Sequence, residues 1–408
     1  MKNTLLILSD LHFGVFAAAN DFAPAGSNLP HQIANAVSMR TSLLECLSQF
    51  DIDAVLVSGD LTSIAAPAEF IGTVEFVEQV RNHCELEPKD VFYTFGNHDL
   101  NWRISKLRDA TEKFGSDTNY ARVAAEIGGL FVTNTECSIL GPVPGSGLFH
   151  RDFLDVVLLN SAYYCTHDQS VEHGKLGQEQ LRWLDQTLPE QKTDGKWRVM
   201  MVHHHPFNYE YPTPGLDIST LEEGAELVEI IGHRGVDLVC HGHRHHPRLS
   251  TQLRNGWQNP VTFFCAGSVG VTEKMRNNGQ IPNLFHVVTL EERSNQNAAV
   301  GRVESFEYSA RDGWDRVNRS SQVPLDSPQR FGSCATSDEQ RSELQQCFEV
   351  QLKQHPENPV PLPDLDSLPL ALKCMPLVEL KRLMSEVATD IGCNVIGTYP
   401  DEVILLRR

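Results

Sequence analysis

The chain has 408 residues, 41% of them hydrophobic and 21% charged, which is typical of folded proteins and excludes a disordered or fibrous chain. Its 34 basic and 53 acidic residues give a formal net charge of -19 at pH 7, which disfavours DNA, RNA and anionic membranes as partners for most of the surface. This length predicts two or three structural units, or one large domain with an appendage.

Short apolar runs that end in polar residues or glycine predict buried strands in the first two thirds of the chain. They lie at residues 5–8, 54–57, 91–95, 156–159, 199–202, 236–239 and 262–265. Apolar residues at helical spacing lie between them, at 43–50, 70–80 and 181–188. Strands that alternate with amphipathic helices predict a layered α/β arrangement. The alternating patterns at 285–289 and 303–307 predict further strands that close the sheets.

The character of the sequence changes near residue 318. The segment that follows, to residue 338, is polar and lacks periodicity, which predicts a domain edge. An amphipathic helix is expected at 337–354, an extended proline-rich spacer at 356–369, a helix at 376–391, and strands at 394–399 and 402–406. We therefore divide the chain into a main domain at 1–325, a helix and proline-rich linker at 326–369, and a small C-terminal α+β module of unknown role at 370–408.

The ten cysteines are scattered, with no C-x-x-C pair, which excludes the common zinc-finger and redox motifs. The first apolar run, at residues 5–8, is too short for the core of a signal peptide or for a membrane span. We therefore expect reduced thiols, no membrane partner and a cytoplasmic location.

Two short motifs follow the first two predicted strands. Asp10 and His12 stand two residues apart, so in an extended segment both side chains can face one cation. Gly59 allows a sharp turn before Asp60, which can reach the same edge of the sheet. Taken alone, each motif is more often an ordinary turn than a site.

Three more motifs follow later strands. Gly96 begins a G-N-H-D tetrapeptide, in which Asn97 offers an amide oxygen, His98 a proton-transfer group, and Asp99 a partner for that imidazole. Histidine-rich turns follow at 203–206 and 241–247. All five motifs follow predicted strands, and ligands of open α/β sheets gather at the carboxyl ends of strands. Their joint occurrence in this order favours a functional site over a set of solvated loops.

Together, these residues resemble the calcineurin-like metallophosphoesterases, whose ordered blocks are D-x-H, G-D, G-N-H-D/E, a histidine-rich turn and G-H-x-H. All five blocks lie between Asp10 and His245. Gly177, Trp183 and Leu184 also resemble the G…W-L helix of many bacterial cyclic-nucleotide and glycerophosphodiester phosphodiesterases of that family. The resemblance implies a four-layer α-β-β-α sandwich for the first three quarters of the chain. It implies nothing beyond about residue 325.

The resemblance also implies a binuclear metal centre, with three ligands on each ion and one bridging carboxylate. The implied ligands of the first ion are Asp10, His12 and His245. Those of the second ion are Asn97, His203 and His243, and Asp60 bridges the two.

Two choices stay open: whether His203 or His204 is the ligand, because both follow the strand, and whether His241 is merely a neighbour of the site. We take His203, the first histidine after the apolar run, as the ligand. The neighbouring histidines are interpreted as packing residues around the site, namely His204, His205, His241 and His246.

Imidazole and oxygen ligands without a thiolate suit manganese, iron or zinc. In the mechanism that the resemblance implies, two divalent or mixed-valence cations lower the pKa of a bridging water, so that hydroxide is available for in-line attack. His98 would stabilise developing charge or protonate the leaving oxygen, and Asp99 would hold its ring.

We therefore predict a metal-dependent phosphoesterase acting on phosphodiesters or phosphomonoesters, with a small phosphodiester such as a cyclic nucleotide favoured. Asp99 disfavours the Ser/Thr protein phosphatases, which carry G-N-H-E. One alternative is a DNA nuclease of the same superfamily, because the S-D-L-H at residues 9–12 is shared with repair nucleases, although the charge of -19 opposes it. Another is a catalytically silent scaffold, which would need gaps in the ligand set. A protein partner or self-association through the C-terminal module also stays open.

Overall fold

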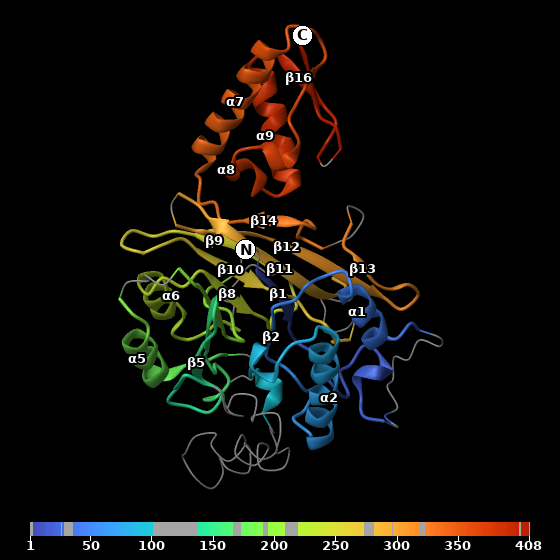
Figure 1. Ribbon diagram of the computed structural model, residues 1–408, viewed down its shortest axis with the longest axis vertical. Helices are drawn as coiled ribbons and strands as arrows, with labels where there is room; N and C mark the ends of the chain where they lie inside the picture. The colour runs from blue at the N-terminus through green and yellow to red at the C-terminus, as the bar shows by residue number, and fades with distance from the viewer. Residues whose placement is uncertain are drawn as a thin grey trace.

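The computed structural model describes residues 3–25, 27, 36–100, 137–165, 173–190, 195–208, 219–272, 281–295, 297–318, 323–399 and 401–407. Two large sheets form its centre (Figure 1). The first has the order β13-β12-β11-β1-β2-β3, with β14 also paired to β12. Its strands are β1 (Asn3–Leu8), β2 (Ala54–Ser58), β3 (Val91–Thr94), β11 (Asn283–Arg293), β12 (Ala299–Ser309), β13 (Gly313–Arg316) and β14 (Gln329–Phe331).

The second sheet has the order β4-β5-β6-β7-β8-β10-β9. Its strands are β4 (Ile139–Leu140), β5 (Gly147–His150), β6 (Leu154–Leu158), β7 (Trp197–Met201), β8 (Leu238–His241), β9 (Arg248–Gln252) and β10 (Val261–Cys265). The central strands β6, β7, β8 and β10 run parallel to one another, as β1, β2 and β3 do in the first sheet. The carboxyl ends of these parallel strands therefore form one edge of each sheet.

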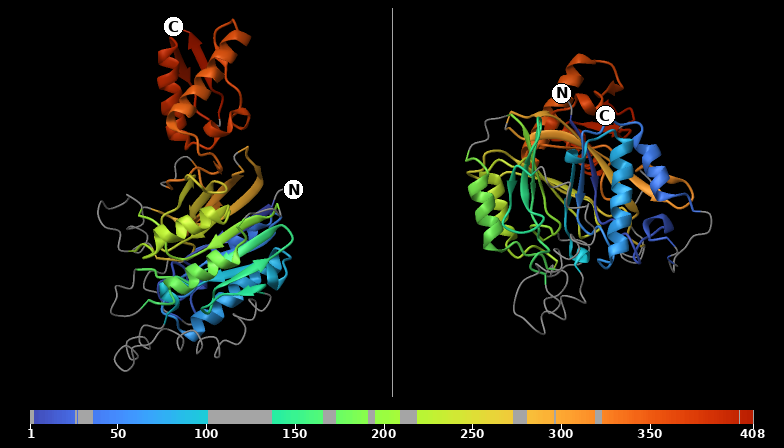
Figure 2. Two further views of the ribbon diagram at one scale, coloured as in Figure 1. Left: turned by 90° about the vertical axis from the view of Figure 1, so that its left-hand side faces the viewer. Right: turned by 60° about the horizontal axis from the view of Figure 1, so that its bottom comes forward.

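The two sheets pack face to face, because successive residues of a buried strand point to opposite sides. In β1, Leu5 and Ile7 belong to an apolar cluster that also holds Val156 and Leu158 of the second sheet. Leu6 and Leu8 belong instead to the cluster beneath the helices of the first sheet. A third cluster lies between the second sheet, where it includes residues of β6 and β7, and the helices that cover that sheet. Three apolar layers thus separate four structural layers and confirm the α-β-β-α sandwich (Figure 2).

Helices α1 (Met39–Leu47) and α2 (Pro67–His83) cover the first sheet, and α5 (Gly177–Thr187) and α6 (Gly224–His233) cover the second (Figure 1). Local sequence sets where the first two begin. The Ser38 hydroxyl accepts a hydrogen bond from the Thr41 amide at the start of α1. Pro67 opens α2, where proline lacks only an amide that would have no partner in the helix. The short 3-10 turns are η1 (Asn20–Phe22), η2 (Pro88–Asp90) and η3 (Asn97–Asp99).

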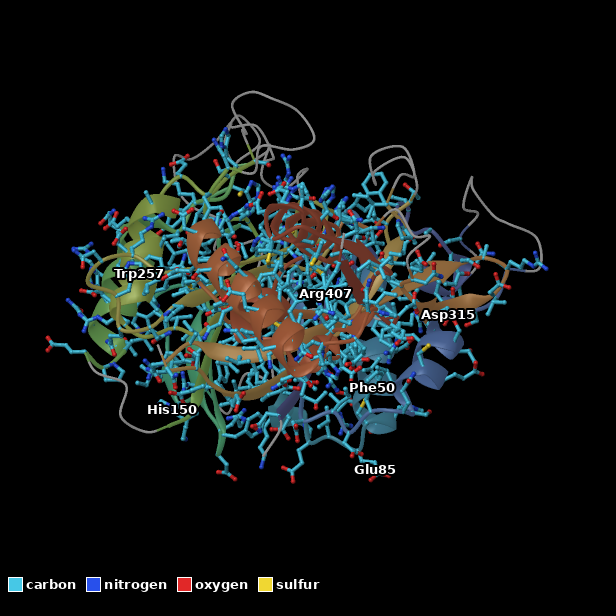
Figure 3. All side chains as sticks on the ribbon, turned by 90° about the horizontal axis from the view of Figure 1, so that it is seen from above. Phe50, Glu85, His150, Trp257, Asp315 and Arg407 are labelled. Carbon is cyan, nitrogen blue, oxygen red and sulfur yellow. The ribbon has the colours of Figure 1, made fainter. Side chains whose placement is uncertain are left out.

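The C-terminal residues form a separate body above the two sheets (Figure 1). It contains α7 (Ser337–Gln354), η7 (Leu365–Ser367), α8 (Leu370–Lys373), α9 (Leu377–Asp390) and a small sheet of β15 (Val360–Pro361), β17 (Ile404–Arg407) and β16 (Cys393–Ile396). In the view from above, Arg407 lies over the middle of the molecule, between Trp257 and Asp315 (Figure 3).

This body has its own hydrophobic core. Phe348 of α7, Val360 of β15 and Leu380 of α9 share one apolar cluster. Its ties to the main domain include an ion pair between Arg330 and Asp366 at 2.6 Å and a hydrogen bond from the Leu377 amide to Asp326 at 2.7 Å. We therefore propose that residues 337–407 are one module, which joins most of the predicted linker (326–369) to the predicted terminal segment (370–408).

The predicted strands of the main domain are confirmed as β1, β2, β3, β6, β7, β8 and β10. The predicted helices at 337–354 and 376–391 are confirmed as α7 and α9. β9 was not predicted, because its sequence R-L-S-T-Q is polar and half-buried throughout. Among the helices in the described part of the chain, none is long and apolar enough to cross a membrane.

Candidate metal centre

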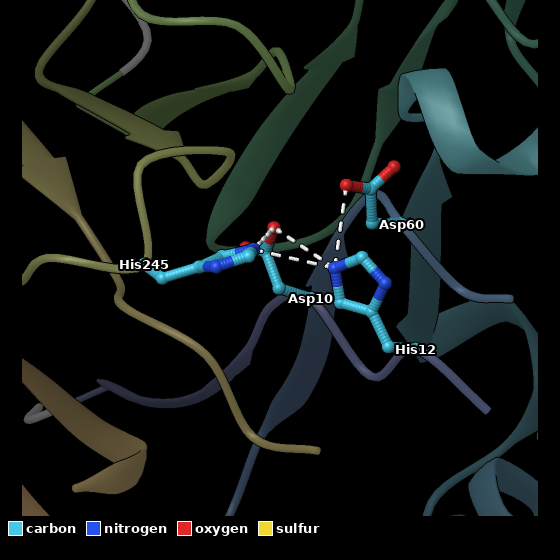
Figure 4. A group of neighbouring side chains, drawn as sticks. All are labelled: Asp10, His12, Asp60 and His245. Atoms are coloured by element: carbon cyan, nitrogen blue, oxygen red, sulfur yellow. Dashed lines mark hydrogen bonds and ion pairs between the residues drawn. The ribbon is translucent and has the colours of Figure 1, made fainter. Parts of the chain in front are cut away.

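The metal ligands predicted from the five motifs converge at the carboxyl ends of the two sheets. Asp10 and His12 follow β1, Asp60 follows β2, and Asn97 opens the turn after β3. The ligands from the second sheet follow β7 and β8, namely His203, His243 and His245. Because the sheets pack face to face, residues almost 240 positions apart in the sequence lie side by side (Figure 4).

The first group consists of Asp10, His12, Asp60 and His245, whose candidate ligand atoms all lie within 4.8 Å of one another (Figure 4). Nε2 of His245 lies 3.1 Å from Oδ1 of Asp10 and 3.2 Å from Nε2 of His12. Nε2 of His12 lies 3.5 Å from Oδ2 of Asp60. Two imidazole nitrogens and two carboxylates therefore face a common centre, which is a donor set suited to one divalent cation.

The second group consists of Asp60, His203 and His243. Nε2 of His203 lies 3.2 Å from Oδ2 of Asp60, the same oxygen that faces His12 in the first group. The rings of His203 and His243 are 5.1 Å apart between centroids. Asp60 thus belongs to both groups, in the position that the family resemblance implies for a bridging carboxylate.

Several buried polar atoms of the site have no hydrogen-bond partner in the described structure. They include Oδ1 of Asn97 and Nε2 of His204, whereas Nε2 of His203 is paired with Oδ2 of Asp60 at 3.2 Å. A buried polar atom that lacks a partner costs about 1–3 kcal/mol, so such atoms are rare in folded proteins. A bound cation would satisfy the Asn97 oxygen, and together with the two donor groups this means that the residues present fit a metal pair.

Burial and mutual proximity favour the neutral form of two predicted ligand imidazoles, those of His12 and His243. Burial lowers the pKa of His12 well below its usual value, and the neighbouring His98 lowers it further. Burial and the neighbouring His204 do the same to the pKa of His243. Neutral imidazoles can bind a metal without first losing a proton.

Asp60 and His203 behave differently, because each stabilises the charge of the other. Burial alone would raise the pKa of Asp60, but His203 and His98 outweigh it and lower that pKa well below the usual value. Burial opposes charge on His203 as well, yet the carboxylate of Asp60 raises the pKa of His203 to about 9. Without metal, this pair is therefore an ion pair, and a cation bound between the two side chains would displace the proton.

The backbone of the site is strained. Five predicted ligands have left-handed φ angles, which residues other than glycine rarely adopt. They are Asp10 (50°), His12 (43°), Asp60 (49°), His243 (71°) and His245 (50°). Such conformations cost about 1–2 kcal/mol per residue and persist only where the surrounding structure enforces them. These turns aim several side chains from short loops at the same point.

Two motif glycines make room for the ligands. Gly59 has a φ of 94°, and a Cβ atom there would lie 2.5 Å from Nδ1 of His203. A Cβ atom at Gly96 would lie 2.1 Å from Oδ1 of Asp60. Both distances are well below van der Waals contact, so any side chain at either position would displace a predicted ligand.

His98 and Asp99 are both at the site, but their hydrogen bonds differ from the expected arrangement. Nδ1 of His98 lies 2.9 Å from the carbonyl oxygen of Ser63, so this carbonyl, rather than Asp99, orients the ring. The Asp99 carboxylate accepts hydrogen bonds from the amides of Gly96, Leu61 and Thr62. Burial and the charge of Asp60 raise the pKa of Asp99 to about 7. Asp99 thus fastens the turn after β3 to the turn after β2.

The structure groups His203, and not His204, with Asp60 and His243. His204 lies beside them, and its Nδ1 is 2.8 Å from the Ser161 hydroxyl. The other neighbouring histidines, His205, His241 and His246, are buried around the site.

Two serines at the site were missed in the sequence. The Ser9 hydroxyl donates to Oδ2 of Asp10 at 2.5 Å, and the Ser58 hydroxyl donates to Ser9 at 2.7 Å. This chain of hydroxyls fixes the rotamer of Asp10. The signal was present, since Ser9 directly follows β1 and Ser58 ends β2, each just before a predicted carboxylate ligand.

The sequence of this chain is similar to those of known proteins. A sequence model of the calcineurin-like phosphoesterase family matches residues 4–247. A probable cyclic nucleotide phosphodiesterase of Synechococcus sp. is 26% identical over 200 residues, which are 49% of this chain and 60% of that protein. The chain therefore matches less than two thirds of that relative.

Two solved structures, one from an animal and one from a bacterium, are similar to this chain at low sequence identity. A dimetal phosphatase from Danio rerio is 12% identical, with a TM-score of 0.43, over 78% of this chain and 99% of the other. A putative 5'-nucleotidase from Staphylococcus aureus is 13% identical, with a TM-score of 0.40, over 87% of this chain and 58% of the other.

Proposed function

This chain belongs to the calcineurin-like phosphoesterase family, and we propose that it hydrolyses a small phosphodiester, with a cyclic nucleotide as the leading substrate. It is a hydrolase of phosphoric ester bonds. The cyanobacterial relative, a probable cyclic nucleotide phosphodiesterase, supports the choice of substrate. The net charge of -19 disfavours a nuclease that acts on duplex DNA.

The position of Asp60 is the observation that carries the proposal. Its Oδ2 lies 3.2 Å from Nε2 of His203 and 3.5 Å from Nε2 of His12, so a single carboxylate oxygen serves both ligand groups. In the proposal, the centre is completed by Asp10, His245, Asn97 and His243, and it holds manganese, iron or zinc. Two ions bound by these residues would polarise the phosphoryl oxygens and make hydroxide available near neutral pH.

His98 is the proposed catalytic residue beside this centre. The Ser63 carbonyl can only accept a hydrogen bond, so Nδ1 of His98 carries a proton and Nε2 is free to exchange one. We assign Nε2 to the leaving oxygen, where it stabilises charge or donates a proton. Asp99 is a positioning residue, because its carboxylate holds the two turns that carry Asp60 and His98.

All ten thiols are free, which supports a reducing, cytoplasmic location as part of the proposal. The C-terminal module remains a candidate surface for a protein partner or a second copy of the chain.

The proposal is tested by assaying purified protein, with added Mn²⁺, against bis-p-nitrophenyl phosphate, a cyclic nucleotide, a glycerophosphodiester and duplex DNA. We expect hydrolysis of the small diesters, loss of that activity with a chelator, and no cleavage of DNA. A rate that is insensitive to chelators, in protein that contains no transition metal by elemental analysis, would refute the metal centre. Cleavage of DNA in preference to the small diesters would instead support the nuclease.

A further inference from the structure

Phe16 lies directly beside the proposed catalytic histidine. Its ring centroid is 5.7 Å from that of His98, with the two planes at 88°. It is also 6.5 Å from the ring of His12, at 68°. Both arrangements are edge-to-face, the geometry that aromatic rings prefer. Phe16 therefore contacts one predicted metal ligand and the group that we assign to the leaving oxygen.

The backbone of Phe16 is held from both sides. Its amide donates to the Ser63 hydroxyl at 3.0 Å, and its carbonyl accepts from the Thr272 amide at 2.9 Å. The next residue, Ala17, forms an antiparallel bridge with Val271. Ser63 is also the residue whose carbonyl orients His98. One serine thus fixes the positions of both the aromatic ring and the imidazole.

The Phe16 side chain does not pack into a hydrophobic core. It belongs to none of the hydrophobic clusters found among the described residues, although its neighbours Phe13, Ala17 and Phe22 all do. Phe16 is half-buried, and so is His98. An aromatic ring in a fixed position that keeps part of its surface open can stack on a planar ligand without the entropic penalty of first becoming ordered.

We propose that Phe16 is a specificity-determining residue that stacks on a planar ring of the substrate, so that the substrate class is a phosphate ester of a nucleoside and not of a ring-free alcohol. This inference rests on the proposed function, because it takes His98 to lie at the leaving oxygen. The group bonded to that oxygen must then pass beside His98, within reach of Phe16. The phenyl ring offers no charge or hydrogen bond for a polyol.

The test compares the binding of two phosphomonoesters that differ in the attached group, 5'-AMP and glycerol 3-phosphate, by titration calorimetry on Mn²⁺-loaded protein. In Phe16→Leu, we expect the affinity for AMP relative to glycerol phosphate to fall by roughly 10- to 100-fold. Phe16→Tyr, which keeps the ring, should retain the wild-type ratio. Phe50→Leu is the matched control, because Phe50 is also half-buried but packs against Phe306, away from the site.

An unchanged ratio in Phe16→Leu would overturn the inference, and so would an equal loss of affinity for both ligands, which would indicate a merely structural role. A wild-type protein that binds AMP no more tightly than glycerol phosphate would overturn it as well. Failure of the proposed function would be seen in a different measurement. The protein would then hydrolyse no phosphate ester, while its relative affinity for AMP and glycerol phosphate would still depend on Phe16.

Discussion

The carbonyl oxygen of Ser63 lies 2.9 Å from Nδ1 of His98, and this contact sets which nitrogen of the proposed catalytic imidazole faces the reaction. The Ser63 hydroxyl donates to the carbonyl of His12 at 2.7 Å, so the same residue also anchors the turn that carries a predicted metal ligand. Acid-base chemistry and metal binding thus share one structural support.

Substitutions of Asp60 and of His98 should affect metal binding and activity in different ways. Asp60→Asn removes a charge that both ligand groups use, so we expect loss of bound metal and of activity down to background. His98→Asn should keep its metal and lose about 10²- to 10⁴-fold in kcat, because it removes only proton transfer and charge stabilisation. Elemental analysis and steady-state kinetics measure the two effects. Asp51→Asn, the same change at an exposed position, is the control. Equal residual activity with full metal content in both variants would contradict these roles.

Gly96→Ala should damage the metal centre without removing any ligand. The added methyl would lie 2.1 Å from Oδ1 of Asp60, so the carboxylate must move. We expect metal affinity to fall by at least tenfold, measured by competition with a chromophoric chelator. Gly195→Ala is the control for backbone strain without a clash, because its φ is 72° but no atom lies within 4 Å of the Cβ position there. Wild-type metal affinity in Gly96→Ala would show that the turn after β3 adapts to the added methyl.

His286 should make the fold less stable in acid. Burial lowers the pKa of its imidazole to about 4, although the Ala266 carbonyl opposes that shift. The unfolded chain, with a pKa near 6.5, binds more protons below that pH, so this contribution to stability is complete above pH 6.5 and is lost as the pH falls toward 4. The full loss amounts to roughly 3 kcal/mol.

Urea unfolding between pH 4.5 and 7.5, in the presence of a chelator, measures this effect. His286→Asn should have a shallower pH dependence of the unfolding free energy than the wild type, even if it is less stable at every pH. His83→Asn, which removes an exposed imidazole, is the matched control. An identical slope in His286→Asn and the wild type would contradict the prediction.

Removal of the C-terminal module should leave the metal centre intact. A chain that ends after Ser333 keeps β14 paired to β12 and keeps the 3.0 Å ion pair between Arg330 and Glu291. It loses the Arg330 to Asp366 pair and the module's separate core. We expect wild-type metal content and hydrolysis of bis-p-nitrophenyl phosphate, with a modest fall in Tm. An unfolded product by circular dichroism would mean that the module is part of the main fold.

The fold was largely predictable, because its central strands are continuous apolar runs and its ligands follow those strands directly. The edge strand β9 was not predictable, since a polar strand that is half-buried throughout has no distinctive pattern of hydrophobic residues. At the site, the resemblance to the calcineurin-like family implied the residues that the structure groups around Asp60. It could not predict the role of Ser63, because a backbone carbonyl acceptor is the same in every residue. The orientation of Asp99 depends on how η3 turns back toward Gly96, which is a tertiary feature.

The left-handed turns at Asp10, His12, Asp60, His243 and His245 bear on any attempt to transplant this centre. Placing the same side chains on a regular helix or an ordinary strand would keep the donor atoms but not their orientation toward a common centre, since neither element contains such turns. A working graft would have to import the loops together with the packed sheets that force them into shape.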